Sequence, residues 1–424
     1  MSFIVVRGGK PLEGKVRISG AKNAALAILP ATIVVRGEVK VANAPRVADV
    51  ETMVNLLAEL GAEARREEDG TVVLSTDGLN TYEAPYEYVS RMRASIYVLG
   101  PLLARFGRAK VALPGGCAFG PRPINFHIYA LQSMGAKVWV EHGYVMAEAP
   151  QGLRGTTIAF ERKSVGATIH TMITAILAEG ETTIENAAIE PEVVDVAHFL
   201  RRCGARIEGE GTDRVVVEGR GRDGFLKACS HYAVIPDRIE TATFLIAGLI
   251  TRGRVEIEGA LPEHLTAVLN KLREAGAKME VNEDRIVVLP SGRLQGRDVE
   301  TAPYPGFPTD VQPMYMALMS VAKGVSVIRE GIYPDRFKHA YELMRLGASI
   351  DVGDGYAVVK GVNRLTGAPV MGTDLRGTAA LVLAGLVAEG ETAVGGYSHL
   401  ARGYENFIGK MRGLGAQISL KNSL

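Results

Sequence analysis

Charged residues of opposite sign stand at matching places in the two halves of this sequence, just ahead of apolar runs with helical character. The first half places cations there, at Lys22, Arg93, Arg162 and Lys163. The second half places acids there, at Asp237, Asp310 and Asp374. The unpaired N–H groups and the dipole of a helix N-terminus favour anions, so the cations would strengthen an anion site. The acids have a simpler alternative as helix caps, which we expect for at least one of them, Asp237.

Arginines form a second recurring set, at points where a strand passes into the next helix: Arg46, Arg122, Arg336 and Arg402. Any one of them alone would be interpreted as a solvated surface residue. Because they occupy equivalent points of a repeat, they suggest a cleft between domains in which forked guanidinium groups hold a phosphate or a carboxylate.

A cysteine lies in a stretch rich in glycine and proline, from Leu113 to Pro123, and this composition predicts a loop. Cys117 is either a structural thiol buried on a turn or a reactive one, and residue types alone favour the structural role. The other two cysteines, Cys203 and Cys229, show no CxxC spacing. We therefore expect reduced thiols and no disulfide framework.

These residues belong to a sixfold internal repeat. A Gly-Ala pair ends an amphipathic segment six times, with its glycines 68 to 74 residues apart, at Gly61, Gly135, Gly204, Gly276, Gly347 and Gly415. Each unit is predicted to contain a helix, a strand, a second helix and a hairpin. The first helix stops at a glycine such as Gly180 or Gly324, and the second stops at the Gly-Ala pair. We expect both glycines to be left-handed caps.

Three units per domain give two similar domains, with a seam near residues 233–237. We assign residues 22–235 to a first three-repeat domain that carries the Cys117 loop, and residues 1–21 plus 236–424 to a second. A strand from Phe3 to Gly8 could pair in either. Between its two glycines the second unit spans 28 residues, whereas the others span 23 to 25. The extra residues fall in the Cys117 loop. Because insertions in repeats often carry functional residues, they favour a reactive role for Cys117 more than its residue type alone does.

Composition limits the function further. The 424 residues are 47% hydrophobic and 22% charged, which is typical of a soluble globular protein, and the net charge of +1 argues against nucleic-acid binding by bulk electrostatics. With no signal peptide and no run of about 20 apolar residues, we expect a cytoplasmic protein without membrane insertion. Signatures for phosphate loops, dinucleotides, serine hydrolysis and zinc are absent, so no cofactor and no metal are expected. We interpret four histidines as ordinary helix residues: His127, His170, His264 and His339.

Seven blocks of the sequence resemble the UDP-N-acetylglucosamine 1-carboxyvinyltransferase family of enolpyruvyl transferases, in the family's order and over nearly the whole chain. They are Ile18 to Leu26, Met92 to Ser95, Pro114 to Pro123, Ser164 to Thr168, Phe307 to Asp310, Thr373 to Arg376 and Arg402 to Glu405. The resemblance implies an α/β fold, a two-domain inside-out α/β barrel. Each domain would hold three βαβαββ-type repeats with pseudo-threefold symmetry, helices inside and sheets outside.

The resemblance also implies an activity: transfer of the enolpyruvyl group of phosphoenolpyruvate to the 3-hydroxyl of UDP-N-acetylglucosamine. The reaction would release phosphate from a tetrahedral intermediate, at the first committed step of peptidoglycan synthesis. In that mechanism Asp310 accepts the hydroxyl proton. Phosphoenolpyruvate is held by Lys22, Asn23, Arg122 and Arg402. Cys117 is then the proton donor or covalent partner and the target of the antibiotic fosfomycin, with Arg122 favouring its thiolate.

The same resemblance places the sugar nucleotide against two stretches and a few further residues. They are Arg122, Pro123, Ile124, Asn125 and Phe126; Arg162, Ser164, Val165 and Gly166; and Asn23, Arg93, Asp310 and Ile332, with Asp374, Arg376 and Arg336 elsewhere in the cleft. The Cys117 loop would be a lid over that cleft. Three residues depart from the family's pattern: Tyr97 replaces tryptophan, Asn125 replaces aspartate and Arg162 replaces lysine. Of these, Asn125 affects the expected uracil contact.

Three alternatives stay open. An enolpyruvyl shikimate phosphate synthase would share the fold and the phosphoenolpyruvate site, but the cysteine loop and the Lys22-Asn23 pair argue against it. A non-catalytic paralogue that binds the sugar nucleotide is disfavoured because Lys22, Cys117, Asp310 and Arg402 occur together. A ribonucleic acid end-processing enzyme of related architecture is disfavoured by the near-zero net charge. The sequence does not determine the oligomeric state.

Overall fold

The computed structural model of the chain describes residues 2–113 and 124–422, which divide into two compact units. We call residues 20–113 with 124–235 the first unit and residues 2–19 with 236–422 the second unit. Each unit has its own hydrophobic core. The chain leaves the second unit after Ser19, whose N–H donates to Glu240 of that unit, and Ala21 already donates to the carbonyl of Ile235 in the first. This passage lies two residues before the boundary that we expected at residue 22.

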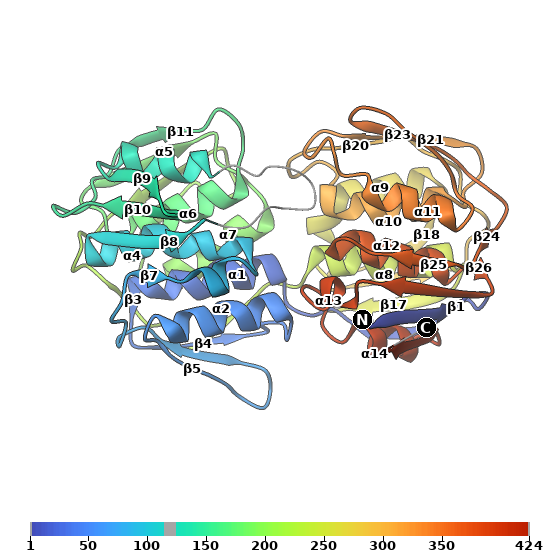
Figure 1. Cartoon of the computed structure of the whole chain (residues 1–424), viewed down its shortest axis with the longest axis horizontal. Coiled ribbons are helices and arrows are strands. Elements are labelled where there is room, and N and C mark those ends of the chain that lie inside the picture. Colours follow the sequence, from blue (N-terminus) through green and yellow to red (C-terminus); the bar gives the residue numbers. More distant parts are fainter. Residues whose placement is uncertain (1, 114–123, 423–424) are drawn as a thin grey trace. The chain divides into compact units, whose positions relative to one another are not determined.

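Each unit contains three repeats of one strand–helix–strand–helix–hairpin arrangement, which confirms the predicted α/β fold (Figure 1). The first helices of the six repeats are α1 (Lys22–Ala31), α4 (Leu99–Phe106), α6 (Val165–Ala175), α8 (Arg238–Ile250), α10 (Gln312–Met319) and α12 (Leu375–Gly385). The second helices are α2 (Ala48–Glu59), α5 (Asn125–Ser133), α7 (Pro191–Arg202), α9 (Thr266–Glu274), α11 (Lys338–Arg345) and α14 (Phe407–Gly413). Shorter helices are α3 (Tyr86–Val89), α13 (Tyr397–Leu400), η1 (Thr32–Val34), η2 (Arg93–Val98), η3 (Pro262–Leu265) and η4 (Thr309–Val311).

The strands of the described residues form six four-stranded sheets, each with the same pairing order, and two small parallel pairs. A short edge strand opens each large sheet: β16 (Tyr232–Ala233), β7 (Glu83–Ala84), β11 (Thr157–Ala159), β2 (Glu13–Arg17), β20 (Val299–Thr301) or β25 (Pro369–Met371). It runs parallel to β4 (Glu38–Ala42), β8 (Arg108–Ala112), β12 (Glu181–Glu185), β17 (Arg254–Glu258), β21 (Val325–Glu330) or β27 (Glu391–Gly395).

Two antiparallel strands complete each large sheet. The inner ones are β6 (Val72–Ser75), β10 (Tyr144–Glu148), β14 (Arg214–Glu218), β19 (Arg285–Leu289), β23 (Tyr356–Lys360) and β1 (Phe3–Arg7). The outer ones are β5 (Glu63–Arg66), β9 (Lys137–Glu141), β13 (Ile207–Glu208), β18 (Lys278–Val281), β22 (Ser349–Val352) and β28 (Gln417–Lys421). The small pairs are β3 (Val35–Arg36) with β15 (Leu226–Lys227), and β24 (Leu365–Thr366) with β26 (Ala388–Glu389).

Three strands belong to a different repeat from the one that follows them in the sequence. Strand β1 lies between β27 and β28, with Phe3 opposite Gly395 and Lys421, so the strand that could have paired in either unit belongs to the second. Strand β2 precedes α1 in the chain but pairs with β17 of the second unit. Strand β16 precedes α8 but pairs with β4 of the first unit, with Tyr232 opposite Val41. The edge strand that precedes α1 of the first unit therefore belongs to the second unit, and the edge strand that precedes α8 of the second unit belongs to the first.

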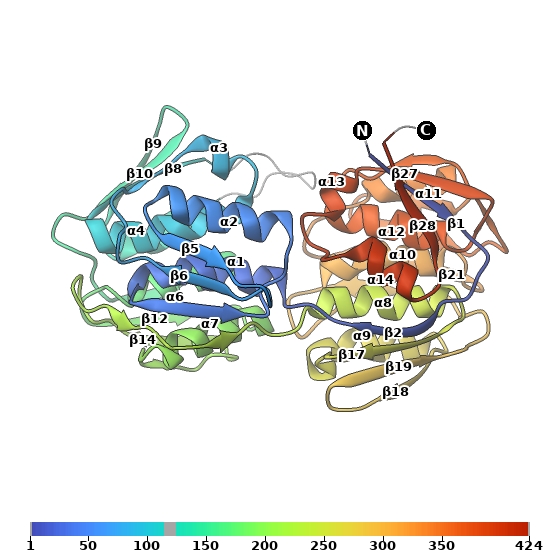
Figure 2. The same ribbon diagram turned by 90° about the horizontal axis from the view of Figure 1, so that it is seen from below.

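The first helices of the repeats are the innermost elements of their units. In the second unit α8, α10 and α12 pack against one another, and Figures 1 and 2 show them within their unit. Every residue of α8 from Ile239 to Ile250 is buried, whereas strands such as β14 alternate between buried and exposed residues. A helix that is buried all round lies in a core, and a sheet whose residues alternate between buried and exposed has one exposed face. The first helices therefore lie inside and the sheets outside, whereas second helices such as α9 and α11 are buried on one side only.

The two sets of glycine caps behave differently. All six Gly-Ala glycines have positive φ, between 89° and 102°. The following alanine donates back into the last turn, as Ala62 does to Leu57 at 2.9 Å, which confirms the predicted caps. For the first helices the expectation holds at α4, whose C-cap Gly107 has φ 73°, but not at helices such as α6. Helix α6 ends at Ala175, and Gly180 (φ 88°) lies after a further turn, directly before β12, so it redirects the chain into the strand.

Candidate active site

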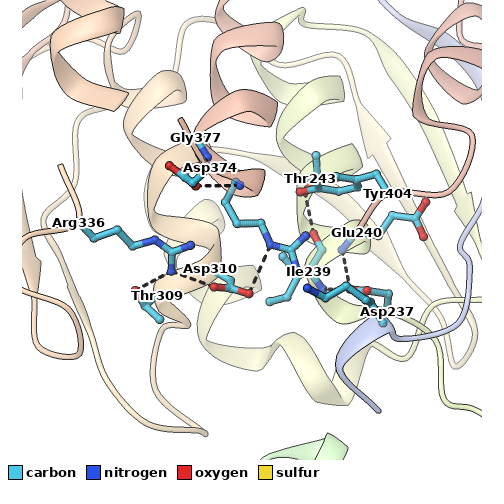
Figure 3. A network of polar contacts seen from close by, with 12 residues as sticks. Asp237, Ile239, Glu240, Thr243, Thr309, Asp310, Arg336, Asp374, Gly377 and Tyr404 are labelled. Atoms are coloured by element: carbon cyan, nitrogen blue, oxygen red, sulfur yellow. Dashed lines mark hydrogen bonds and ion pairs between the residues drawn. The ribbon is translucent and has the colours of Figure 1, made fainter. Parts of the chain in front are cut away.

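The three acids of the second unit lie at the N-termini of its three central helices, but they do not have the same role. Asp237 caps α8 by accepting from the N–H groups of Ile239 and Glu240, at 2.8 and 2.9 Å. Asp374 caps α12 in the same way. Asp310 lies inside η4 ahead of α10, and the N-cap positions of these two helices are Pro308 and Val311 instead. Because α8, α10 and α12 pack together, these N-termini lie close to one another (Figure 3).

Asp310 lies between two buried arginines, Arg336, which is labelled in Figure 3, and Arg376. Its Oδ1 is 2.8 Å from Nη1 of Arg336, and its Oδ2 is 3.3 Å from Nε of Arg376. Both arginine side chains are 2% exposed, whereas that of Asp310 is 29% exposed. The carboxylate is thus the part of this ion-pair network that solvent, or a ligand, can reach.

Each arginine is fixed by further contacts. The backbone carbonyl of Arg336 accepts from the side-chain amide of Gln312. The guanidinium of Arg336 donates to Oγ1 of Thr309 at 3.1 Å. The guanidinium of Arg376 lies 5.0 Å from the centre of the Tyr404 ring. Burial opposes the charge on Arg376, but the nearby Tyr404 and Asp310 outweigh it and raise its pKa. The two guanidinium groups are therefore held in place before any substrate arrives.

The remaining predicted residues of the second unit lie in turns. Arg402 is half-buried in the turn after α13, where its N–H donates to the carbonyl of His399. Ile332 is half-buried in the turn after β21. Tyr404 lies in the block from Arg402 to Glu405, for which the sequence predicts no role at this position. Its hydroxyl lies 2.7 Å from Oγ1 of Thr243, and its ring covers Arg376.

In the first unit, the cations also lie at helix N-termini. Lys22 is the first residue of α1, and its Nζ is 3.3 Å from Oδ2 of Asp49, which belongs to the first turn of α2. The side chains of Lys22 and Asp49 are 12% and 6% exposed, so this is a largely buried ion pair. Asn23 is exposed on the next position of α1. Arg93 begins η2, which packs against α1.

The N-terminus of α6 carries a second group of predicted residues. Ser164 is its N-cap and accepts from the N–H of Ala167 at 3.2 Å, and Val165 and Gly166 form the first turn. This turn presents unpaired N–H groups of the kind that bind phosphate. At Gly166, a Cβ atom would lie 3.3 Å from Nε2 of His127, so this position leaves little room for a side chain.

Beside that turn, the guanidinium of Arg162 lies 5.6 Å from the centre of the Phe126 ring, which in turn contacts Phe160 at 5.6 Å. Ile124 is buried and Asn125 is exposed at the start of α5. The structure therefore brings together the two stretches that were predicted to bind one ligand, 124–126 and 162–166.

A pair of histidines was missed. The rings of His127 and His170 meet edge to face, with their centres 4.8 Å apart, and Nε2 of His170 accepts from the N–H of Gly100 at 2.8 Å. Burial, and then the charge of Arg93, lowers the pKa of His127 to about 3, and burial lowers that of His170 well below its usual range. Both rings are therefore neutral. Nothing in their sequence spacing indicates a contact, although His127 directly follows the predicted 122–126 stretch.

Some predictions lie outside the described residues, namely those for Cys117, Arg122 and Pro123. Arg46 is one of the recurring arginines of the first unit. It is exposed and donates to the carbonyls of Glu67 and Glu68.

Within residues 2–113 and 124–422, no cluster of three or more histidine, cysteine or acidic side chains could hold a metal ion. No helix in the same ranges has both the length and the apolar character that a membrane span requires.

Comparison with known proteins defines the class. A family model for EPSP synthase (3-phosphoshikimate 1-carboxyvinyltransferase) matches residues 6–411. The solved structure of the enolpyruvyl transferase NikO from Streptomyces tendae has a TM-score of 0.90 and 26% identity, covering 100% of this chain and 99% of that one. EPSP synthase from Acinetobacter baumannii, with a TM-score of 0.76 and 19% identity, covers 100% of both chains and shares the fold. Fold and family model together define an enolpyruvyl transferase.

Curated relatives narrow the class further. A protein of Xylella fastidiosa named UDP-N-acetylglucosamine 1-carboxyvinyltransferase is 52% identical over 99% of both chains. A protein of the same name from Pseudoalteromonas atlantica is 49% identical, again over 99% of both. The chain belongs to the UDP-N-acetylglucosamine 1-carboxyvinyltransferase family.

Proposed function

We propose that this protein transfers the enolpyruvyl group of phosphoenolpyruvate to the 3-hydroxyl of UDP-N-acetylglucosamine and releases phosphate, in the cytoplasm, as the first committed step of peptidoglycan synthesis. Identity of about half of all residues with relatives of that name, over the full chain, supports the substrate pair. The observation that carries the proposal is the geometry of Asp310, a reachable carboxylate held by two buried guanidinium groups.

The reaction has two stages. In the addition, the sugar oxygen bonds to C2 of phosphoenolpyruvate while its proton leaves, and C3 gains a proton to become a methyl group. In the elimination, the C2–phosphate bond breaks, the methyl group loses a proton and the double bond returns. A protein that performs both stages needs a base for the hydroxyl, an acid for C3 and cations for the phosphate and carboxylate.

We assign the hydroxyl proton to Asp310, whose carboxylate is 29% exposed. Arg336 and Arg376 favour the charged carboxylate, so we expect the proton to move as the carbon–oxygen bond forms rather than before. Cys117 is proposed as the proton donor to C3 or as a covalent partner.

The proposed phosphoenolpyruvate ligands are Lys22, Asn23, Arg122 and Arg402. For Lys22, the pairing with Asp49 fixes the Nζ position at the helix N-terminus, which suits a point charge that meets an anion.

The sugar nucleotide is proposed to bind residues 122–126 and 162–166, together with Asn23, Arg93, Asp310 and Ile332. The turn capped by Ser164 supplies N–H groups for a phosphate, and the adjoining surface of Phe126 and Arg162 offers a ring and a planar cation. Asp374, Arg376 and Arg336 are proposed to support the site by positioning Asp310.

Release of phosphate from phosphoenolpyruvate tests the proposal, measured with UDP-N-acetylglucosamine and, in parallel, with shikimate 3-phosphate. Phosphate should be released from phosphoenolpyruvate when UDP-N-acetylglucosamine is present, and not when shikimate 3-phosphate replaces it. Arg402→Ala should reduce kcat/KM at least tenfold, whereas Arg46→Ala, at an equivalent repeat position but bound to backbone carbonyls, should stay near the parent value. Release with shikimate 3-phosphate instead would identify the sister activity, and release with neither would indicate a non-catalytic protein.

A further inference from the structure

Two cysteines that are distant in the sequence lie in contact in the first unit. The sulfur atoms of Cys203 and Cys229 are 3.3 Å apart, and both residues are free thiols. Cys203 is the C-cap of α7, and Cys229 lies in the segment between β15 and β16. Both are nearly buried, at 3% and 8% exposure. Nothing in the proposed transfer reaction uses either thiol.

The backbone on both sides of this contact is anchored to α7 and its end. The N–H of Lys227 donates to the carbonyl of Cys203 at 3.2 Å. Further along, the hydroxyl of Tyr232 donates to the carbonyl and carboxylate of Asp195, two turns earlier on α7. The contact between the sulfurs is therefore part of a longer seam between α7 and the segment 227–235, and not a chance approach of two mobile side chains.

We propose that Cys203 and Cys229 form an oxidisable dithiol, which a hydroperoxide converts into a disulfide that ties the end of α7 to the segment between β15 and β16. A disulfide needs its sulfurs about 2 Å apart, so the two atoms have to approach by only a little more than about 1 Å. Rotation of the two side chains can supply much of that movement, because hydrogen bonds already hold the backbone on both sides of the contact close together.

The oxidation balances with a peroxide as the oxidant. The thiolate of one cysteine attacks a peroxide oxygen; an S–O bond forms, the O–O bond breaks, and water leaves after protonation, giving a sulfenic acid. The second thiol then attacks that sulfur; the S–S bond forms, the S–O bond breaks and a second water leaves. Two thiols and one hydrogen peroxide thus give one disulfide and two waters.

Cys229 is the better first nucleophile of the two. It is the more exposed thiol, and the S–H of Cys203 donates to its sulfur. That hydrogen bond, with the nearby charge of Arg202, lowers the pKa of Cys229 to about 7, whereas the same contact and burial raise the pKa of Cys203. The phenol of Tyr232 and the Asp195 carboxyl lie on the same seam, and the pKa of each is raised by burial. Cys203 then acts as the resolving thiol.

The disulfide would close the segment 203–229, which contains the hairpin β13–β14 and the small strand β15. Closing a loop of this length restricts the unfolded chain, so the first unit should unfold at a temperature about 5–10 °C higher when oxidised. The segment that follows supplies β16 to the sheet of β4, and a fixed Cys229 would also hold that edge strand more firmly.

The test uses the full-length protein, treated with hydrogen peroxide and then with an alkylating agent, and digested with trypsin without reductant. The expected product is peptide 203–206 joined to peptide 228–238, lighter by two hydrogen atoms than the sum of the two. Dithiothreitol should restore both free peptides. Failure to find the linked peptide while Cys117 is oxidised, or linkage of either peptide to the one that holds Cys117, would overturn the proposal.

Cys203→Ser and Cys229→Ser are the matched controls. Neither variant should form the cross-link, and neither should show the oxidation-dependent rise of the unfolding temperature. A rise of equal size in Cys229→Ser would refute the disulfide as its cause. The mapping experiment needs only the parent protein, so the proposal stays testable even if a serine variant folds poorly.

Discussion

Replacing Asp310 with asparagine should separate the two contributions of this carboxylate, to stability and to catalysis. Asparagine keeps the size of the side chain and one carbonyl oxygen but removes the negative charge. Arg336 and Arg376, each 2% exposed, would then face one another across a neutral group. The second unit should become less stable, and proton transfer from the sugar hydroxyl should lose its acceptor.

The size of the stability loss follows from the burial of the network. Removing one partner of a buried ion pair costs about 3–5 kcal/mol, and an exposed pair contributes about 0–1 kcal/mol. With its side chain 29% exposed and both partners buried, Asp310 lies between these limits. We therefore expect a loss of about 2–3 kcal/mol in the free energy of unfolding of the second unit. Catalysis by a positioned base contributes about 10²–10⁴-fold, so kcat should fall by that factor.

Urea unfolding followed by circular dichroism measures the first quantity, and phosphate release measures the second. Asp374→Asn is the matched control for stability, because it changes the same residue type in the same unit and asparagine caps a helix as well as aspartate. Its free energy of unfolding should stay within about 1 kcal/mol of the parent. The two units can unfold in separate transitions, so the loss in Asp310→Asn should appear in one of them.

Two results would refute this reasoning. If Asp310→Asn were no less stable than Asp374→Asn, the carboxylate would not be the counter-charge of the buried arginines. If its stability fell as expected but kcat were unchanged, Asp310 would have a structural role and another group would accept the hydroxyl proton.

Three further predictions concern the thiol loop, a buried acid and the repeat glycines. Fosfomycin should add its mass to the peptide that contains Cys117, and labelling of either other cysteine by mass spectrometry would contradict the assignment. Burial raises the pKa of Glu240 from 4.5 to about 7, so its contribution to stability is complete below about pH 4.5 and is lost as the pH rises through about 7. Urea unfolding across this range should show a loss of up to about 3 kcal/mol that Glu240→Gln removes, and an unchanged pH profile would disprove the role of this carboxyl. Gly276→Ala should lower the free energy of unfolding by about 1–2 kcal/mol, because its φ is +97° while the space around the missing Cβ is open. Gly292 also has open space but no positive φ, so Gly292→Ala should leave the free energy of unfolding almost unchanged. Equal shifts of the unfolding temperature in the two variants would argue against backbone strain.

The repeat was accessible from the sequence because it depends on local chemistry. A glycine that ends a helix needs a positive φ, which few other residues adopt, so the Gly-Ala pairs reported the six second helices directly. The first helices were recognisable from their unbroken apolar runs, but apart from α4, which ends at Gly107, the glycines after them did not mark ends such as that of α6. Gly180 marks the start of a strand instead of the end of α6, because the chain makes an additional turn between them.

The pairing of strands that are distant in the sequence could not be predicted from the sequence, for a physical reason. Strands β2 and β16 have the same place in the sequence relative to the helices α1 and α8, and each unit contains an equivalent strand, β4 or β17, with which an edge strand forms a parallel pair. The sequence favours neither partner, since a two- to five-residue edge strand carries little register information. The choice is made by the complete sheets, β17 for β2 and β4 for β16.

The candidate site shows the same division. Residue types and their recurrence at helix starts indicated Lys22 and Asp310 from the sequence alone, because charge at a helix N-terminus is a local property. The cap role of Asp237 was also predictable, because it accepts from N–H groups only two and three residues further on. Only tertiary packing decided that Asp310 pairs with buried arginines. The contact between Cys203 and Cys229 likewise arises from the end of one helix meeting a later segment. Such contacts depend on how whole elements pack, and no spacing in the sequence encodes them.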